Sequence, residues 1–200
     1  MTDSPSDGRE ALRLHLLVLR CQAGDERAFA RLIDRYADRT LRYLGGLVGD
    51  GAEDVNQEVW LTVYRRIATL TDPRRFRTWL YRTTRHHAID FLRAQRRERD
   101  LFDDAGEAED LPAAAGALDP APDLPTLDAL LRDLAPMHRE VLLLRYRDEL
   151  SYAEIAIVAG CSVGTVRSRL HYATRRLRDH HAHVTAPLQR SADPTTRGVL

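Results

Sequence analysis

The sequence predicts an all-α protein with two small helical domains joined by a flexible acidic linker. Apolar residues recur at intervals of three and four through residues 9–98 and again after residue 126, which is the period of amphipathic helices and not of strands. Between these parts, the stretch EDLPAAAGALDPAPDLP is rich in Ala, Pro, Gly and Asp and poor in large apolar residues. Such a stretch cannot offset the entropy of folding, and it therefore divides the chain in two.

The first domain should contain four or five helices. The apolar period breaks at AGDE, GDGAED and LTDP, where Gly, Asp and Pro gather. Residues 1–8, ahead of the first helix, are expected to be disordered. The positions that define the helices are Leu12, Leu16 and Leu19; Phe29, Leu32, Ile33 and Tyr36; Leu41, Leu44 and Leu47; Val55, Val59, Val63 and Ile67; and Trp79, Leu80, Ile89 and Leu92.

The second domain carries the signals of a helix-turn-helix unit. Pro136 suits a first helical turn, and Ser151 followed by Glu154 makes a capping box. That helix should end at Gly160, which takes a left-handed conformation without strain, and the next helix should begin at Ser162. The contact between the two helices is expected from Ile155, Ala159, Cys161, Val166 and Leu170.

Beyond about Arg178 the helical period is lost, and residues 181–200 are predicted to form a disordered tail. Cys21 and Cys161 lie far apart in apolar segments, which indicates small core residues rather than a disulfide. The N-terminus is acidic and no apolar run is long enough to cross a membrane, so we expect a cytoplasmic protein without membrane insertion.

Charge is balanced overall but strongly segregated. The chain has 30 basic and 30 acidic residues, and every basic residue is arginine. Residues 74–99 hold nine arginines against two acids, whereas residues 100–128 hold nine acids and no base. Residues 165–178 hold five arginines and no acid. The two basic blocks are candidates for binding a polyanion.

In a helix-turn-helix unit the second helix enters the major groove of DNA, where arginine can read a guanine edge and the helix N-terminus can hold a phosphate. A plain pair of packed helices, with arginines that suit the helix dipole, is the alternative interpretation of the same pattern. The residues expected to face DNA are Ser162, Val163, Gly164, Thr165, Arg167, Ser168, Arg169, His171, Tyr172, Arg175 and Arg176.

The segment from Phe76 to Arg97 combines arginines with the aromatics Phe76, Trp79, Tyr81 and Phe91. This mixture is typical of single-stranded DNA binding, because cations follow the phosphates while aromatic rings stack on unpaired bases. Trp79 and Phe91 lie at apolar-stripe spacing, and we assign them to the core.

Two long motifs together resemble one family. LAPMHREVLLLRYRDELSYAEIAIVAGCSVGTVRSRLHYATRRLR is similar to the −35-binding domain of extracytoplasmic-function sigma factors of the bacterial sigma-70 family. GDERAFARLIDRYADRTLRYLGGLVGDGAEDVNQEVWLTVYRRI and FRTWLYRTTRHHAIDFLRAQRR resemble that family's −10-binding and polymerase-binding domain. The resemblance implies sigma region 2 at residues 9–98, a linker at 99–125 and region 4 at 126–180.

The resemblance also implies roles for single residues. Spacing alone favours a solvated face for the acidic side of AEDVNQEVWLTVYRR, whereas the family docks this helix on the largest polymerase subunits. Asn56 stands where the family usually has an apolar or small residue, and His86 where it commonly has asparagine. The implied polymerase contacts are Asp54, Gln57, Glu58, Trp60 and Leu61, and the implied −10 contacts are Arg74, Arg75, Arg77, Arg82, Arg85, His86, Arg93, Arg96 and Arg97.

The function implied is an alternative sigma factor that binds core RNA polymerase and promoter DNA, without catalytic activity, cofactor or metal, and with an anti-sigma factor as a further partner. Its linker would thread the polymerase cleft. A stand-alone helix-turn-helix regulator is the first alternative and would bind a palindromic site without polymerase. A metallohydrolase using His86 and His87, or His180, His181 and His183, is the second, although no His-Glu-x-x-His arrangement is present.

Overall fold

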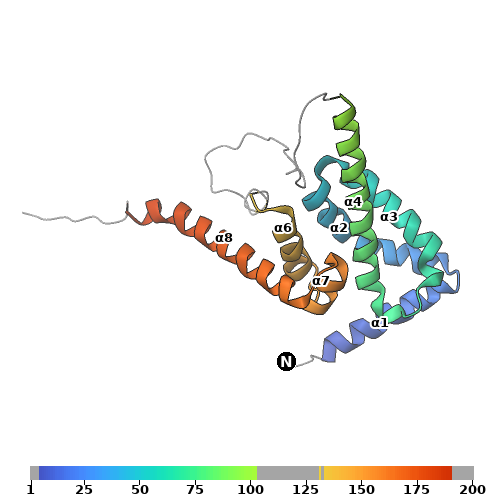
Figure 1. Cartoon of the computed structure of the whole chain (residues 1–200). Helices are drawn as coiled ribbons and strands as arrows, with labels where there is room; N and C mark the ends of the chain where they lie inside the picture. Colours follow the sequence, from blue (N-terminus) through green and yellow to red (C-terminus); the bar gives the residue numbers. More distant parts are fainter. Residues whose placement is uncertain (1–4, 103–130, 132, 191–200) are drawn as a thin grey trace, which may run out of the picture.

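The structure is a computed structural model that describes residues 5–102, 131 and 133–190, and within these ranges it contains helices and no strands. Helices α1 to α4 form an N-terminal bundle (Figure 1). Short 3-10 turns lie ahead of α3 and between α3 and α4. The bundle helices are α1 (Pro5–Gln22), α2 (Glu26–Val48), α3 (Ala52–Arg66) and α4 (Phe76–Phe102).

Helices α6, α7 and α8 form a C-terminal unit, in which a π-helical turn at Leu143–Arg147 continues α6. Figure 1 shows α6 and α7 lying between α8 and the N-terminal bundle, with the far end of α8 extending away from the body. The helices of this unit are α6 (Pro136–Leu142), α7 (Tyr152–Ala159) and α8 (Val163–Arg190).

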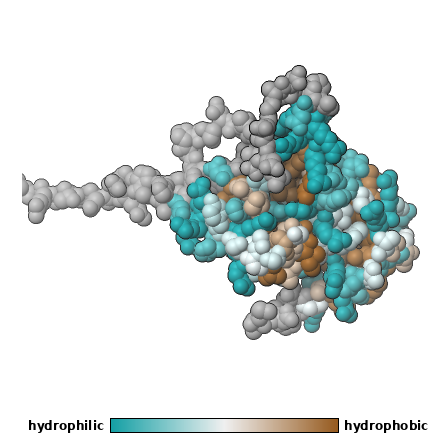
Figure 2. Space-filling model, in the orientation of Figure 1, coloured by the Kyte–Doolittle hydropathy of each residue, from teal (hydrophilic) through white to brown (hydrophobic). Residues whose placement is uncertain are grey.

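The core of the N-terminal bundle forms along the predicted apolar stripes. Val18, Leu32 and Val59 are fully buried, and Tyr36 packs edge-on against Phe76 with ring centroids 5.6 Å apart. Trp79 and Phe91 pack against this core and are partly buried, as predicted. On the face drawn in Figure 2, hydrophilic residues lie beside smaller hydrophobic patches. All members of this core belong to α1–α4 and the turns between them.

A buried polar network links α2 to α3 and explains Asn56. The hydroxyl of Thr40, which is fully buried, lies 2.7 Å from Asn56 Oδ1 and accepts a hydrogen bond from Trp60 Nε1 at 3.3 Å. Asn56 Nδ2 also donates to the carbonyl of Ala37. Asn56 is therefore accommodated by a partner on α2.

The predicted turns of the C-terminal unit are confirmed. Ser151 Oγ accepts from the Glu154 amide at 3.2 Å, while the Glu154 carboxylate accepts from the Ser151 amide at 2.8 Å. Gly160 ends α7 with φ of 65°, a left-handed conformation that glycine adopts without strain. Ser162 Oγ accepts from the Thr165 amide at 3.0 Å and caps α8. Ile155, Val166 and Leu170 are buried between the two helices.

Three predicted boundaries were wrong. α1 begins at Pro5, inside the segment expected to be disordered, because proline suits the first helical position. α4 continues to Phe102, past the expected linker start at residue 99, since no glycine or proline occurs before Gly106. α8 continues to Arg190 rather than ending near residue 180, because extending an existing helix needs no further nucleation, and Pro187 in its last turn removes only one backbone donor. Of the expected linker, residues 103–125 lie outside the described residues, as do tail residues 191–200.

The two units pack directly on one another, which the sequence did not predict. The core of the C-terminal unit includes Tyr43 of α2 and Tyr81 of α4, whose rings meet edge-to-face at 5.5 Å. Gly46 of α2 faces the π-helical turn so closely that an added Cβ would lie 2.5 Å from Leu143 Cδ1. The backbone carbonyl of Gly46 accepts from Arg139 Nη1 at 2.9 Å.

Two buried carboxylates of the C-terminal unit bind polar groups of the bundle. Glu140 Oε1 accepts from the Tyr43 hydroxyl at 2.9 Å and from Arg85 Nε at 2.7 Å. Asp148 is fully buried; its Oδ1 accepts from the Tyr81 hydroxyl, and its Oδ2 has no hydrogen-bond partner. Burial raises the pKa of both tyrosines, so both hydroxyls stay protonated and donate.

Burial also raises the pKa of Asp148 above its ordinary value. The hydrogen bond from Tyr81 and the charges of Arg39, Arg147 and Arg77 oppose this shift without cancelling it. The packed arrangement therefore binds the protonated carboxyl in preference to the carboxylate.

Replacing Thr40 by valine should destabilise the bundle by about 1–3 kcal/mol, because the Trp60 indole N–H and Asn56 Oδ1 lose their shared partner. Urea denaturation measures the loss. Thr69→Val, which removes an exposed hydroxyl bonded to the Arg66 carbonyl, is the control and should change stability by less than about 0.5 kcal/mol. Equal losses in the two variants would contradict the role of the network.

Replacing Asp148 by asparagine should raise the melting temperature at pH 7 to 8. The raised pKa means that the contribution of Asp148 is fully favourable below the ordinary carboxyl pKa and is lost as pH rises through the raised value. Asparagine keeps the acceptor for Tyr81 and carries no charge, so the stability of the variant should depend less on pH between the ordinary carboxyl pKa and the raised value. Thermal melts across pH, with exposed Asp133→Asn as the control, test this; a less stable variant with the wild-type pH profile would refute it.

Candidate nucleic-acid interface

The first turns of α8 present a polar, arginine-bearing face. Val163, Gly164, Arg167 and Ser168 are exposed, while Thr165 is half-buried beside its cap Ser162. The first amides of a helix have no intrahelical partners, and such a terminus attracts anions. His171, Arg175 and Arg176, one to three turns further along, are also exposed, and Arg175 lies 3.7 Å from Asp179.

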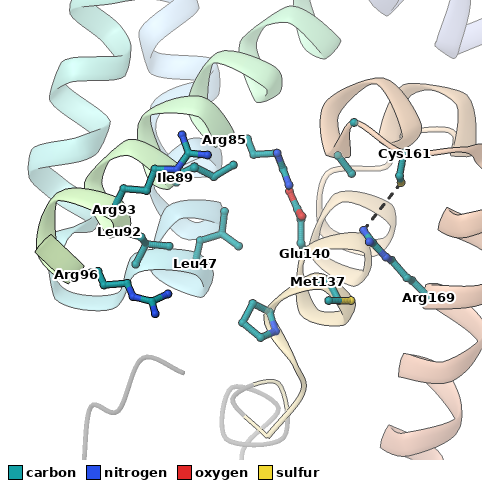
Figure 3. A pocket seen from close by; sticks show the side chains of 14 residues that line it. Leu47, Arg85, Ile89, Leu92, Arg93, Arg96, Met137, Glu140, Cys161 and Arg169 are labelled. Carbon is teal, nitrogen blue, oxygen red and sulfur yellow. Dashed lines mark hydrogen bonds and ion pairs between the residues drawn. The ribbon is translucent and has the colours of Figure 1, made fainter. Parts of the chain in front are cut away.

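Two of the residues predicted to face DNA are oriented differently. Arg169 is half-buried, and its Nη1 lies 4.0 Å from Cys161 Sγ, on the side toward the N-terminal bundle (Figure 3). Tyr172 is exposed along one edge, but its ring packs on His138 with centroids 4.4 Å apart. The outward face of α8 is thus carried by Arg167, Arg175 and Arg176.

The arginines predicted to contact the −10 element fall into two groups along α4 and the turn before it. Arg77 and Arg85 are half-buried and bind the C-terminal unit: Arg77 donates to the Asp148 carbonyl, and Arg85 pairs with Glu140. The exposed members are Arg74, Arg75, Arg82, Arg93, Arg96 and Arg97, together with His86, whose Nε2 lies 3.2 Å from Asp90 Oδ2.

The expected stacking aromatics are not exposed. Phe76 is fully buried in the bundle core because it packs on Tyr36 and lies near Trp79. Tyr81 is also buried, in part beneath the C-terminal unit through its hydrogen bond to Asp148. Of the two aromatics, only Tyr81 is covered by residues from the other domain.

One face of α3 is acidic and amide-rich, as predicted. Asp54, Gln57 and Glu58 are exposed, and the side chain of Leu61 beside them is 46% exposed. Trp60 was expected near the same contact, but it is buried, because its indole N–H reaches Thr40 on α2. Trp60 therefore lies in the core beneath this face and is not part of its surface.

The adjacent histidines point to different partners. His86 approaches Asp90, whereas His87 Nε2 lies 3.0 Å from Thr62 Oγ1, and burial lowers the pKa of His87. Among the described residues, no three His, Cys, Asp or Glu side chains gather in a way that could hold a metal ion. Cys21 is buried and Cys161 half-buried, and both are free thiols.

A cleft of about 430 Å³ lies between the bundle and the C-terminal unit (Figure 3). Its apolar lining comes from α2, α4 and the start of α6, and includes Leu47, Ile89, Leu92 and Met137. Arginines from both units also line it, namely Arg85, Arg93, Arg96 and Arg169. Sequence reasoning gave no sign of this cleft, because its walls come from segments of both units that are far apart in the chain.

The polar groups that join the two units were also missed. Tyr43, Glu140 and Asp148 carry no motif, and their partners lie 97, 55 and 67 positions away. One signal was present: Glu140 stands next to the apolar run VLLL, where a carboxylate can be buried only with a partner.

None of the helices in the described ranges combines the length and hydrophobicity that a membrane crossing requires.

Comparison with known proteins matches segments of both helical units to one family. Residues 32–98 match the family model of sigma-70 region 2, and residues 130–179 match that of sigma-70 region 4. The first match contains α3 and most of α4, and the second contains the helix-turn-helix.

Two curated relatives cover both parts of the chain. The extracytoplasmic-function sigma factor BldN of Streptomyces coelicolor is 34% identical over 180 residues, covering 86% of this chain and 67% of the relative. The sigma-E factor of Escherichia coli K12 is 36% identical, covering 82% of this chain and 92% of the relative.

Two solved structures share the fold. CnrH, solved in complex with the cytosolic domain of CnrY, is 23% identical with a TM-score of 0.58 and covers 90% of this chain and 99% of its own. The sigma factor RpoE of Bartonella quintana, solved with the anti-sigma factor NepR, is 23% identical with a TM-score of 0.61 and covers 76% and 95%. The chain therefore belongs to the extracytoplasmic-function sigma factors of the sigma-70 family, and it is an alternative sigma factor that directs transcription initiation by RNA polymerase.

Proposed function

We propose that this sigma factor uses three separate surfaces: the start of α8 for the −35 element, the exposed arginines of α4 for the −10 element, and the acidic face of α3 for polymerase. The observation that carries this proposal is the segregation of charge on the folded chain. Two arginine-rich faces stand on different domains, and the exposed acidic face of α3 is separate from both. A single autonomous DNA-binding unit would need only one basic face.

At −35, the start of α8 would lie in the major groove. The Ser162 cap and the free amides after it would hold a phosphate and fix the register, while Arg167 would read a base edge. Arg175 and Arg176 lie about two turns and a half further along the helix than Arg167, where they would meet the backbone. Arg169, which faces the bundle in this structure, would need to reorient to take part.

At −10, the exposed arginines of α4 would follow the phosphates of the opened strand, helped by Arg74 and Arg75 in the turn ahead of the helix. Since Phe76 is a core residue, base stacking would depend on Tyr81, which α4 can offer only when the C-terminal unit does not cover it. In this proposal region 2 would span α1–α4 and region 4 would span α6–α8.

Polymerase would dock on Asp54, Gln57, Glu58 and Leu61. An exposed leucine among carboxylates and an amide offers an apolar anchor with a polar rim, the arrangement of protein interfaces. The protein would act in the cytoplasm with polymerase, without catalysis of its own. An anti-sigma factor is a further proposed partner, because the RpoE of Bartonella quintana was solved with one.

Run-off transcription with purified bacterial core polymerase tests the function as a whole. A library of genomic fragments serves as template, and start sites are mapped with and without the protein. New starts that share one pair of upstream elements are expected. A footprint on DNA that needs no polymerase, with no new starts, would favour the stand-alone regulator.

Arg167→Ala should lower transcription from a mapped promoter by about tenfold, because a good arginine contact to a base edge contributes about 1–3 kcal/mol. Its effect should vanish on templates whose −35 element has been scrambled. Arg178→Ala, an exposed arginine further along the same helix, is the matched control and should leave transcript yield near wild type. A loss that is equal on intact and scrambled templates would argue against base reading by Arg167.

Leu61→Glu should weaken binding to core polymerase by about tenfold or more, since it places a charge at the apolar centre of the proposed face. Leu12→Glu is the matched control, because this leucine is also exposed but lies on α1. Fluorescence anisotropy of labelled protein titrated with core polymerase measures both affinities. Equal affinities of the two variants would exclude Leu61 from the contact.

A further inference from the structure

We propose that the cleft between the bundle and the C-terminal unit binds a small amphipathic acid, a molecule with an aliphatic chain and a carboxylate head group. This inference does not depend on the function proposed above, because the cleft and its lining are features of the chain by itself. It concerns a small molecule, and it needs neither DNA nor polymerase.

The walls of the cleft are aliphatic. Leu47, Ile89 and Leu92 line it from the bundle, and Met137 lines it from the start of α6 (Figure 3). Methionine has a flexible side chain that adapts to the shape of a ligand. The volume of about 430 Å³ falls in the range of sites that bind small organic molecules. The cleft can therefore enclose an acyl chain of moderate length.

The lining disfavours other common classes of ligand. Of the 14 described residues that line the cleft, none carries an aromatic ring, a hydroxyl or a side-chain amide. An unpaired nucleobase is ordinarily held by stacking on aromatic rings, and a sugar requires several neutral hydrogen-bonding groups. A saturated chain needs neither, because it is bound through the burial of its apolar surface.

The charged groups of the lining favour an anion. Four arginines and one glutamate line the cleft, so that four positive charges stand against one negative charge. The glutamate already has its partners, because Glu140 Oε1 accepts from Arg85 at 2.7 Å and from Tyr43 at 2.9 Å. The other arginines of the lining are Arg93, Arg96 and Arg169. Positive charge therefore exceeds negative charge around the aliphatic walls.

Arg169 is placed to hold the head group. It lies on the side of the cleft that α8 forms, across from Arg93 and Arg96 of α4 (Figure 3). Arg169 is half-buried, so its charge is screened less than that of an exposed arginine. Its Nη1 lies 4.0 Å from Cys161 Sγ, and no carboxylate of the described residues pairs with it. Because sulfur is a weak acceptor, a ligand carboxylate is the stronger partner for this guanidinium.

Equilibrium dialysis of the full chain tests the site, with decanoate as the probe. Two matched probes separate its features: acetate has the head group without the chain, and decyltrimethylammonium has the same chain with a cationic head. Below the concentrations at which micelles form, decanoate should bind at least about tenfold more tightly than either, because it alone satisfies both the walls and the arginines. Equal affinity for the two decyl compounds would overturn the inference.

The thiol of Cys161 reports whether the probe occupies this cleft. It lines the cleft and is half-buried, so a bound chain should shield it from alkylation. In a chain with Cys21→Ser, decanoate at ten times its Kd should slow alkylation by iodoacetamide about tenfold, because mass action leaves about a tenth of the sites empty. Acetate at the same concentration should leave the rate unchanged. Bound decanoate that does not slow the reaction would place the site elsewhere and refute the assignment.

Arg169→Met tests the head-group contact, because it removes the charge and keeps an apolar side chain. The variant should bind decanoate about tenfold more weakly and decyltrimethylammonium no more weakly than wild type. Arg178→Met is the matched control, since Arg178 is exposed on the same helix and lies outside the lining. Thermal melts of both variants verify that they fold. Equal decanoate affinities of the two folded variants would exclude Arg169 as the head-group partner and contradict the inference.

A phospholipid offers the same chemistry at a membrane surface, with an anionic head group on aliphatic chains. Vesicles of phosphatidylglycerol, at an acyl-chain concentration equal to that of decanoate, test this second source. They should not shield Cys161, because the cleft encloses a separate molecule and not a bilayer surface. Shielding by vesicles without shielding by decanoate would overturn the assignment to a small acid.

Discussion

The pairing of two buried carboxylates with tyrosines and arginines governs how the two halves of this molecule are arranged. Glu140 and Asp148 cannot be buried without partners, because an isolated carboxylate in a protein interior is strongly unfavourable. Their partners stand on α2 and α4, which the C-terminal unit reaches only by packing against both helices. Buried ion pairs add little net stability, so the contact chiefly selects an orientation.

The same contact decides which functional groups are accessible. Arg82 and Arg93 are exposed on α4, while Arg77 and Arg85 on the neighbouring stripe are engaged. On α8, Arg167 faces outward whereas Arg169 faces the bundle. Arginines that look equivalent in the sequence therefore divide into two groups: those exposed on the surface and those turned toward the other domain.

Local signals predicted the elements well, and they did so for physical reasons that act within a few residues. The Ser151 and Glu154 capping box, the left-handed Gly160 and the Ser162 cap each satisfy backbone groups close by, so their positions could be assigned from the chain alone. The interhelical contact of Ile155, Val166 and Leu170 followed from the same spacing. The residues of the proposed binding surfaces were inferred from the family resemblance, and the comparisons confirmed the family.

What the sequence could not predict depends on distant partners. Trp60 and Tyr81 are aromatic residues of the kind that bind partners, but both are buried. Trp60 is hydrogen-bonded to Thr40, 20 positions away, and Tyr81 is hydrogen-bonded to Asp148, 67 positions away. Helix ends were missed for another reason: in α4 and α8 the helix continues past the residues that pack against a core, and in α8 it continues through Pro187, a residue type that ordinarily ends a helix. Periodicity reports where a helix is buried, not how far it extends.

The length of α8 has a mechanical consequence. Twenty-eight residues make a helix about 42 Å long, with its first turns packed on α7 and the other end projecting from the body (Figure 1). A rotation of about 10° about the packed end would carry the far end through roughly 7 Å. A load applied along the projecting part of α8 would therefore act as torque on the turn between Gly160 and Ser162, where the first turn of the helix is anchored.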